Sequence, residues 1–176
     1  SKNIVSPKGF KAAGVHCGIK HKKKDLAIIV SEVPASVAGV FTTNKVQAAP
    51  IKVTKEVVYN TKKMQALIVN SGNANACTGK QGLADAYEMQ SLAAEKLGIE
   101  PYLIGVASTG VIGEIMKMGP IQNGVPQLEP SDSLESGIDF AQAILTTDTV
   151  MKNTTYATVI DGKEVLVSGT AKGSGM

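Results

Sequence analysis

Residues 104–114 read IGVASTGVIGE, an apolar run that stops at a hydroxyl residue followed by glycine. This pattern predicts a buried strand that delivers Thr109 and the backbone N–H of Gly110 to a surface where a ligand binds. A threonine hydroxyl and a backbone amide are neutral donors that can be held in place before reaction, so together they suit the oxyanion of a polarised carbonyl. The alternative is a plain turn, because the same residue types dominate turns for local hydrogen-bonding reasons.

The residues before this stretch complete a strand, loop, helix and strand unit. Residues 66–69 are an apolar run that predicts a strand, and residues 70–79 predict a loop rich in asparagine, glycine and other small residues. An α/β fold commonly places a binding site at such a loop, although Asx turns alone account for the same composition. Residues 81–97 carry apolar side chains at three- and four-residue steps, which predicts a helix, and Gly98 suits its left-handed cap. Whether the two strands run parallel is left open.

The chain on either side of this unit predicts further strands and helices. Apolar runs predict strands at residues 26–30 and 36–41, and the glycine-containing residues 1–24 predict a loose entry segment. Residues 51–59 fit either a strand or a helix. Residues 115–125 predict an irregular segment, because glycine and proline interrupt it.

Two local signals predict the C-terminal part. A helix is expected from about Ser131, where Asp132 and Glu135 have the spacing of a capping box. The pair Asp161-Gly162 predicts a type I′ turn between two strands. The glycine-rich residues after the second strand predict a cut end, and the mixture of strands and helices predicts an α/β chain.

Composition and charge favour a globular chain. The 176 residues are 43% hydrophobic and 19% charged, which is typical of a folded domain. No apolar stretch approaches the roughly 20 residues needed to cross a bilayer, and the N-terminus has no signal-like segment. We therefore expect a cytoplasmic protein that does not associate with membranes.

The basic residues and the cysteines predict neither a nucleic-acid site nor a metal site. The net charge is +3 and the chain has three Phe, four Tyr and no Trp, so the basic run KHKKK at 20–24 has few aromatic neighbours on which bases stack. We expect this run to be a solvated loop. Cys17 and Cys77 have neither CxxC nor zinc-site spacing, so we expect free thiols, no metal and no cofactor.

Four motifs occur along the chain in a characteristic order. They are VNSGNANACTG at 69–79, STGVIG at 108–113, TTDT at 146–149 and AKGSGM at 171–176. Together they closely resemble the ornithine acetyltransferase (glutamate N-acetyltransferase) family of arginine biosynthesis, and the resemblance extends from about Ile4 to the end of the chain. In that family a precursor cuts itself before a threonine shortly beyond the KGSGM segment. The resemblance implies that residues 1–176 are a single-domain α chain, completed by a β chain.

The resemblance also implies an architecture and an assembly. The two chains are expected to complete an α/β/β/α sandwich, which the family shares with a group of self-processing aminopeptidases, and the pair is expected to double into an α2β2 heterotetramer. Members often have proline where this chain has Lys117 and Met151, so the geometry of these two loops is expected to differ.

The family's mechanism implies roles for four residues of this chain. The nucleophile is the N-terminal threonine of the β chain, with its own α-amine or a water as base. By resemblance, the Thr109 hydroxyl and the Gly110 N–H form the oxyanion hole, and Thr146 and Lys172 contact substrate. Without the resemblance, Lys172 has the features of an ordinary solvated lysine. The implied reaction is ping-pong acetyl transfer from N2-acetylornithine to glutamate through an acetyl-threonine.

Two other functions stay open from the sequence. An amidohydrolase or aminopeptidase of the same fold uses the same nucleophile but releases acetate or an amino acid to water. A non-catalytic binding subunit uses the glycine loops only as turns. Whether acetyl-CoA serves as a second acetyl donor is also left open.

Overall fold

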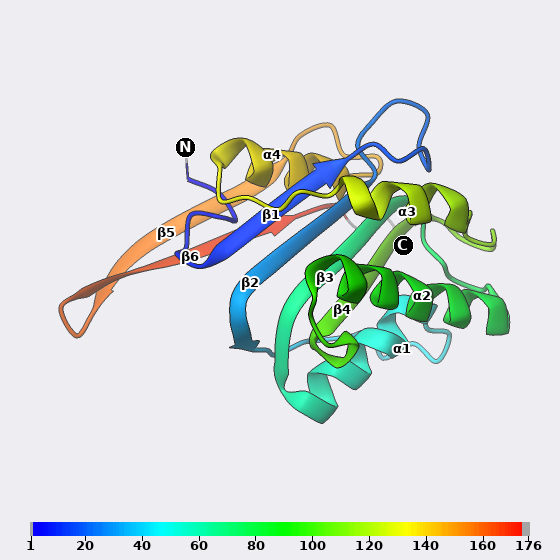
Figure 1. The fold of residues 1–176 in the computed structure, drawn as a ribbon, viewed down its shortest axis with the longest axis horizontal. Helices are drawn as coiled ribbons and strands as arrows, with labels where there is room; N and C mark the ends of the chain where they lie inside the picture. Colours follow the sequence, from blue (N-terminus) through cyan, green and yellow to red (C-terminus); the bar gives the residue numbers. More distant parts are fainter. Residues whose placement is uncertain (1, 174–176) are drawn as a thin grey trace.

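The strand that contains Thr109 is the last of a four-stranded sheet. In the computed structural model, which describes residues 2–173, the strand order is β1-β2-β3-β4 (Figure 1). The strands are β1 (Phe10–Val15), β2 (Leu26–Ser36), β3 (Lys63–Asn73) and β4 (Ile104–Val111). β2 is antiparallel to both β1 and β3, whereas β3 and β4 run parallel. A parallel pair needs a crossover connection, and α2 (Gly79–Leu97) supplies it, so the predicted order of strand, loop, helix and strand is confirmed. The loop predicted at 70–79 is wrong in its first part, because β3 continues to Asn73 in its pairing with β4.

Helices cover both faces of this sheet. The helices α1 (Ala49–Glu56), α2 and α3 (Met118–Gly124) pack on the face that carries Ile68. The helix α4 (Leu134–Ala143) packs on the face that carries Val69. Side chains alternate between the two faces along a strand, which is why these neighbouring residues belong to different core clusters. The arrangement confirms the predicted α/β class.

Short turns connect the main elements. One turn of π-helix, Val57–Thr61, follows α1, and 3-10 turns at Pro101–Leu103 and Val125–Gln127 precede β4 and follow α3. Gly98 caps α2 with a φ of 64°, as the sequence predicts. Within residues 2–173, none of the helices has the length and apolar character needed to cross a membrane.

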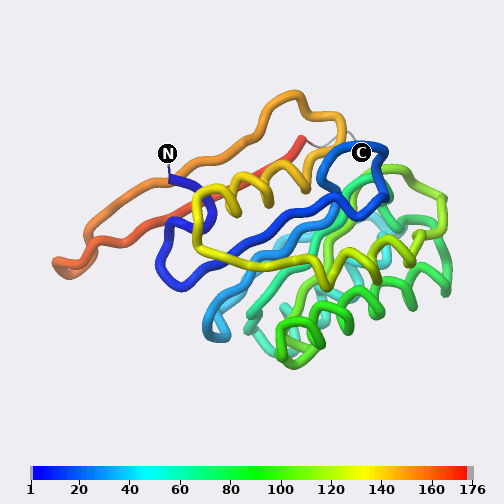
Figure 2. The backbone as a smooth tube through the Cα atoms, turned by 45° about the horizontal axis from the view of Figure 1, so that its top comes forward, coloured from blue at the N-terminus to red at the C-terminus, as the bar shows by residue number. Residues whose placement is uncertain are grey.

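The C-terminal hairpin forms a separate two-stranded sheet from β5 (Lys152–Ile160) and β6 (Lys163–Ala171). Asp161 and Gly162 have φ values of 50° and 74°, the left-handed conformation that a type I′ turn needs. The predicted hairpin is therefore confirmed. Figure 2 shows its tip projecting beyond the four-stranded sheet, while its last residues return toward that sheet.

The predictions for the N-terminal third need correction. The strand expected at 36–41 is wrong: Val40 is fully exposed, and the Phe41 ring packs edge-on against Tyr59 with their centroids 5.9 Å apart. The pairing of β2 with β3 ends where Ser36 meets Lys63, the first residue of β3, and after the Val37 N–H has donated to the Lys62 carbonyl the chain continues as an irregular segment. The loose entry segment is also wrong in part, because β1 lies within it and pairs with β2. Residues 51–59, which fitted a strand or a helix, are helical.

Two further corrections concern the segment between β4 and β5. The stretch predicted to be irregular contains the helix α3, because Pro120 lies in its first turn, where a missing N–H costs no helical hydrogen bond. The helix α4 is confirmed, but its predicted cap is wrong. Ser133 is the N-cap residue and accepts a hydrogen bond from the Ser136 N–H at 3.1 Å, so Asp132 and Glu135 form no capping box.

Candidate functional site

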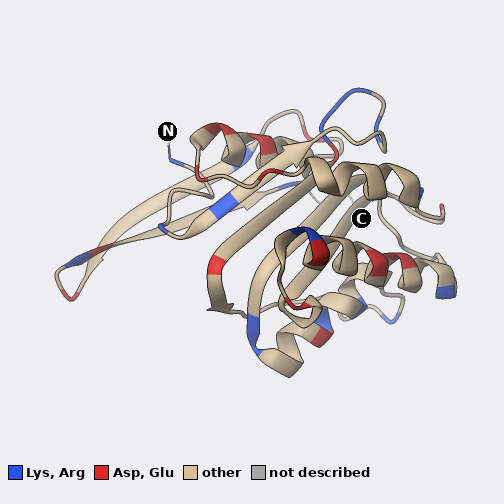
Figure 3. Ribbon diagram, in the orientation of Figure 1, with Lys and Arg blue, Asp and Glu red and all other residues tan. Residues whose placement is uncertain are grey.

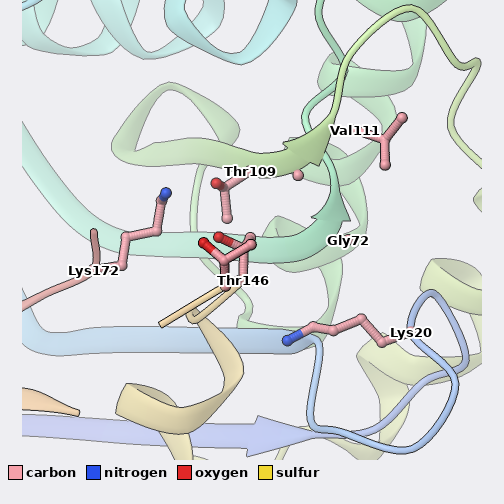
Figure 4. A pocket seen from close by; sticks show the side chains of 8 residues that line it. Lys20, Gly72, Thr109, Val111, Thr146 and Lys172 are labelled. Atoms are coloured by element: carbon pink, nitrogen blue, oxygen red, sulfur yellow. The ribbon is translucent and has the colours of Figure 1, made fainter. Parts of the chain in front are cut away.

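A cavity of about 460 Å³ opens where the parallel strands β3 and β4 end (Figure 4). The residues that line it are Lys20, Gly72, Thr109, Gly110, Val111, Thr146, Thr147 and Lys172. They come from the loop before β2, the ends of β3 and β4, the turn after α4 and the segment after β6. The carboxyl ends of parallel strands are where open α/β sheets bind ligands. All four residues singled out from the sequence lie in this one cavity.

The end of β4 presents Thr109 and Gly110 to the cavity. In the parallel pairing Gly110 lies beside Gly72, and its φ is 132°. A Cβ on Gly110 would lie 2.7 Å from the backbone nitrogen of Asn73, so a larger residue does not fit without a shift of the backbone. The predicted strand is confirmed, and it continues beyond the apolar run to Val111. The sheet therefore holds the hydroxyl and the amide in place before a ligand arrives.

The turn after α4 brings Thr146 to the cavity. The Ser71 hydroxyl in β3 donates to the Ala143 carbonyl at 2.5 Å, which ties the end of α4 to the sheet. Two residues further on, the Leu145 carbonyl accepts a hydrogen bond of 2.6 Å from a lysine of the loop before β2. Figure 4 shows Thr109 and Thr146 in the middle of the lining side chains. Both hydrogen bonds stabilise the position of this turn beside the sheet.

Lys172 follows β6 and is connected to the same turn. Its ammonium donates to the Gly173 carbonyl at 2.7 Å, and the Gly173 N–H donates to Asp148 Oδ1 at 2.5 Å. The Asp148 side chain is only 3% exposed and also forms an ion pair with Lys152 at 2.6 Å. The hydrogen bonds from Lys152 and Gly173 lower the pKa of Asp148 to about 2. One carboxylate thus joins two of the sequence motifs; residues 174–176 of the last motif lie outside the described residues.

Lys20 is a charged cavity residue that lies outside the four sequence motifs, and the sequence analysis missed it. Most of the basic run at 20–24 is exposed, as expected of a solvated loop, and Figure 3 shows it beyond the ends of β1 and β2. Lys20 instead lines the cavity, and its partial burial lowers the pKa of its ammonium. The reason lies in Asp25, a fully buried carboxylate that accepts backbone hydrogen bonds from Lys20 and Cys17 at 2.7 Å and from Gly18 at 3.3 Å. No sequence signal separates this lysine from its neighbours.

The asparagine-rich stretch that begins in the last residues of β3 and continues beyond it has a structural role. Asn70, Asn73 and Asn75 are all buried. The Asn73 side-chain oxygen accepts from the Asn75 N–H at 2.7 Å, and the Asn75 side chain donates to the Gly82 carbonyl at 2.8 Å. These bonds satisfy backbone groups of the connection, which supports the turn interpretation of this stretch. Gly72 is its contribution to the cavity lining.

Cysteine, histidine, aspartate and glutamate are absent from the described lining of this cavity. Cys17 and Cys77 are both free thiols. Burial, together with the charge of Asp25, raises the pKa of the Cys17 thiol to about 12, so this thiol is unreactive at neutral pH. Among residues 2–173, no three His, Cys, Asp or Glu side chains are grouped so that they could hold a metal ion.

The lining has a definite chemical character. It combines threonine hydroxyls, a backbone amide and two ammonium groups, and none of the described lining residues is a carboxylate. Hydroxyl and amide donors suit an oxyanion, and ammonium groups suit a carboxylate. The described lining also has no histidine or cysteine, so it offers neither a thiol nucleophile nor an imidazole base for acyl transfer.

Sequence comparison relates the chain to one family. The sequence profile of the ArgJ family matches residues 11–176. The arginine biosynthesis bifunctional protein ArgJ of Halalkalibacterium halodurans is 56% identical over 174 residues, which are 99% of this chain and 42% of that protein. The protein of the same name from Streptococcus mutans is 58% identical over 99% of this chain and 43% of its own length. This chain therefore spans less than half the length of these curated relatives.

Two solved structures share the fold. The crystal structure of arginine biosynthesis bifunctional protein ArgJ from Bacillus halodurans matches with a TM-score of 0.97 at 56% identity, covering 99% of this chain and 92% of that chain. Ornithine acetyltransferase from Mycobacterium tuberculosis, complexed with ornithine, matches with a TM-score of 0.92 at 38% identity, covering 99% of this chain and 93% of that one. The chains in these two structures are thus close to this chain in length.

Proposed function

This chain belongs to the ArgJ family, and from that premise we propose that it is the α chain of a two-chain acetyltransferase of arginine biosynthesis. The proposed reaction transfers the acetyl group of N2-acetylornithine to glutamate, in ping-pong order, through an acetyl-threonine on the β chain. The observation that carries the proposal is the meeting of Thr109, Gly110, Thr146 and Lys172 in one cavity. The ornithine bound to a relative of the same fold supports an amino-acid substrate of this kind.

In this proposal the end of β4 stabilises the charge that develops on the acetyl oxygen. Attack by the β-chain threonine converts the acetyl carbonyl into a tetrahedral oxyanion, to which the Thr109 hydroxyl and the Gly110 N–H donate. Collapse of this intermediate breaks the amide C–N bond and expels ornithine, whose amine takes up the proton that the threonine hydroxyl lost. The glutamate amine then attacks the acetyl-threonine, and cleavage of the ester C–O bond gives N-acetylglutamate and restores the threonine hydroxyl. Because β4 is paired with β3, its donors need no reorganisation during the reaction. One such donor contributes about 3 kcal/mol to the stability of the transition state.

Thr146 and Lys172 are the proposed substrate contacts of this chain. Both substrates carry an α-carboxylate, which an ammonium group binds through charge-assisted hydrogen bonds. Among residues 2–173, the Lys172 ammonium uses one of its three N–H donors on the Gly173 carbonyl and has no second partner. The Thr146 hydroxyl adds a neutral donor beside it.

The proposed assembly has two polypeptides from one precursor. Residues 1–176 are the single-domain α chain, and the β chain begins with the nucleophilic threonine and completes an α/β/β/α sandwich. The pair doubles into an α2β2 heterotetramer in the cytoplasm. Support comes from chain lengths: this chain covers 42% of an ArgJ relative but 92% of the matching chain in a crystal structure of ArgJ, as a cut precursor would give.

The test uses the full-length precursor, purified as the assembled protein. Mass spectrometry is expected to find two polypeptides, the second beginning with threonine. With N2-acetylornithine, ornithine is expected to accumulate over many turnovers only when glutamate is present, together with an equal amount of N-acetylglutamate. Release of ornithine at the same rate without glutamate would identify a hydrolase instead, and no turnover with either mixture would identify a binding subunit.

A second donor is tested in the same assay. The name "bifunctional" that the relatives carry supports trying acetyl-CoA in place of N2-acetylornithine. Formation of N-acetylglutamate from acetyl-CoA and glutamate would add this donor to the proposed function. Without such formation, N2-acetylornithine is the sole donor of the two.

A further inference from the structure

Lys20 occupies a place in the cavity for which the proposed chemistry has no use. Within the described part of the chain its ammonium donates one hydrogen bond, of 2.6 Å, to the Leu145 carbonyl, and its two other N–H donors can serve a ligand. We propose that Lys20 is a specificity-determining residue that binds the side-chain carboxylate of an acidic acceptor amino acid. This inference rests on the proposed transfer to glutamate and deepens it.

The charge of the cavity supports this assignment. Lys20 and Lys172 are the two charged residues among its described lining residues, and both are cations. Figure 4 shows their side chains entering from different sides, with Thr109 and Thr146 between them. Glutamate carries two carboxylates, whereas N2-acetylornithine carries one carboxylate and a cationic side chain. Two ammonium groups therefore match the acceptor at both of its ends and the donor at one end only.

The backbone of Lys20 is held by a buried network. The Asp25 carboxylate is fully buried and accepts the Lys20 N–H at 2.7 Å, together with two N–H groups earlier in the same loop. The Asp25 carbonyl accepts the Ser71 N–H at 2.8 Å, which ties the loop to β3. The Asp25 carboxylate also lies 3.3 Å from the His16 ring. Burial lowers the pKa of Lys20, and the charge of Asp25 raises it by a smaller amount. These hydrogen bonds thus hold the loop in place as part of the cavity wall.

The stem of Lys20 packs directly on the end of β3. A Cβ on Gly72 would lie 3.1 Å from Lys20 Cγ and 2.8 Å from Ile19 Cγ2, so a side chain at this position would press on the lysine and its neighbour. Gly72 also has a φ of 108°, which disfavours any other residue. The close approach directs the ammonium along the cavity rather than out to solvent.

A positioning role for Lys20 predicts different kinetics. If Lys20 only held the turn that carries Thr146, through the Leu145 carbonyl, its loss would weaken the binding of both substrates alike. If it binds the side-chain carboxylate of the acceptor, its loss weakens the acidic acceptor alone. The two roles are therefore separated by comparing two acceptors in the same Lys20 variant.

The experiment compares glutamate with glutamine, because the carboxamide keeps the size of the side chain and removes its charge. Values of kcat/KM for both acceptors are measured on the assembled two-chain protein with saturating N2-acetylornithine. The wild type is expected to prefer glutamate, and Lys20→Met to lower this preference about tenfold or more. Lys20→Arg keeps most of the preference. Lys22→Met, which changes an exposed lysine of the same loop, serves as the matched control and keeps all of it.

The first half-reaction supplies the second readout. Release of ornithine from N2-acetylornithine in a single turnover is expected to fall less in Lys20→Met than kcat/KM for glutamate does, because loss of the hydrogen bond to Leu145 affects both substrates and loss of the carboxylate contact affects the acidic acceptor alone. Equal losses with glutamate and glutamine, or an unchanged preference, would overturn the inference while the wild type still transfers acetyl groups. A wild type that transfers none to glutamate would remove the proposed function, and the inference with it.

Discussion

The end of the four-stranded sheet and the β5–β6 hairpin are built in opposite ways. At the end of the sheet, the buried Ser71 bonds to a carbonyl 72 positions away in the chain, and the buried Asp25 organises the loop that carries Lys20. The two hairpin strands pair with each other, and Tyr156 and Val159 on them are 71% and 69% exposed. The cavity wall is thus specified by long-range polar contacts within this chain, whereas the hairpin depends on local pairing.

Lys172 stands at the meeting point of these two regions. It emerges from the hairpin, yet it lines the cavity, and the chain beside it is joined to the turn after α4 through Asp148. The comparison therefore predicts large effects for changes in the cavity wall, intermediate effects at Asp148 and small effects at the tip of the hairpin.

Gly110→Ala is expected to have the largest effect, because it acts at the closest contact of the wall. A Cβ there would lie 2.7 Å from the Asn73 nitrogen, at a φ of 132° that disfavours alanine. We expect kcat/KM for acetyl transfer to fall by about 10³-fold. The control is Gly113→Ala, at a φ of 84° with open space around it, which is expected to cost less than tenfold. Similar kinetics for the two variants would contradict the role given to the close contact.

Asp25→Asn tests the buried network behind Lys20. An amide cannot replace a carboxylate that accepts three backbone N–H groups, so we expect the free energy of unfolding to fall by about 2–4 kcal/mol. Denaturation by urea, followed on the assembled protein, measures it. Asp132→Asn, at an exposed position, is the control and is expected to stay within about 0.5 kcal/mol. A loss below about 1 kcal/mol for Asp25→Asn would show that the loop is held by other contacts.

Asp148→Asn tests the link between the two regions, through its dependence on pH. The pKa of Asp148 falls from 3.8 to about 2 in the folded protein, so the folded state binds this proton less readily than the unfolded state. Its contribution to stability is therefore present above about pH 4 and is lost as the pH falls toward 2. Urea denaturation between pH 2 and 7 is expected to show a deficit for the variant at neutral pH that shrinks over this range. A deficit that does not vary with pH would contradict the ion pair.

Gly162→Ala is expected to have the smallest effect. Gly162 has a φ of 74° at the hairpin turn and open space around it, so alanine adds only backbone strain of about 1 kcal/mol. Because the tip is remote from the cavity wall, kcat/KM is expected to stay within about twofold of the wild type. Thermal unfolding measures this strain. Gly119→Ala is the control, because Gly119 also lies in open space but has no left-handed φ. A loss of activity above fivefold would show that the tip is coupled to the cavity.

The sequence predicts the fold where a local pattern and the tertiary packing agree. The period of α2, the cap at Gly98 and the Asp161-Gly162 turn are local signals, and all are confirmed. The sequence does not predict β1. The middle of this strand, Ala12, Ala13 and Gly14, consists of small residues with little strand preference, and its packing against α4 requires them. A Cβ on Gly14 would lie 2.9 Å from the Phe140 nitrogen, so close approach of the two elements selected glycine here.

In the candidate site, too, the residues with a local sequence signal are predicted and the one that depends on tertiary packing is not. Thr109, Gly110, Thr146 and Lys172 stand in motifs that can be read along the chain, and all four line the cavity. Lys20 stands in a run of similar residues, and its place depends on how a buried carboxylate folds the loop around it. A contact between a loop and a distant carbonyl has no local signature in the sequence.

The central claim is that the end of β4 holds the donors of an oxyanion hole, and Thr109→Ala tests it most directly. In the assembled two-chain protein, with processing verified by mass spectrometry, kcat is expected to fall by about 10²- to 10³-fold with little change in the free energy of unfolding. Thr109→Ser, which keeps the hydroxyl, is expected to retain most of the activity. A Thr109→Ala protein that transfers acetyl groups at the wild-type rate would contradict the claim.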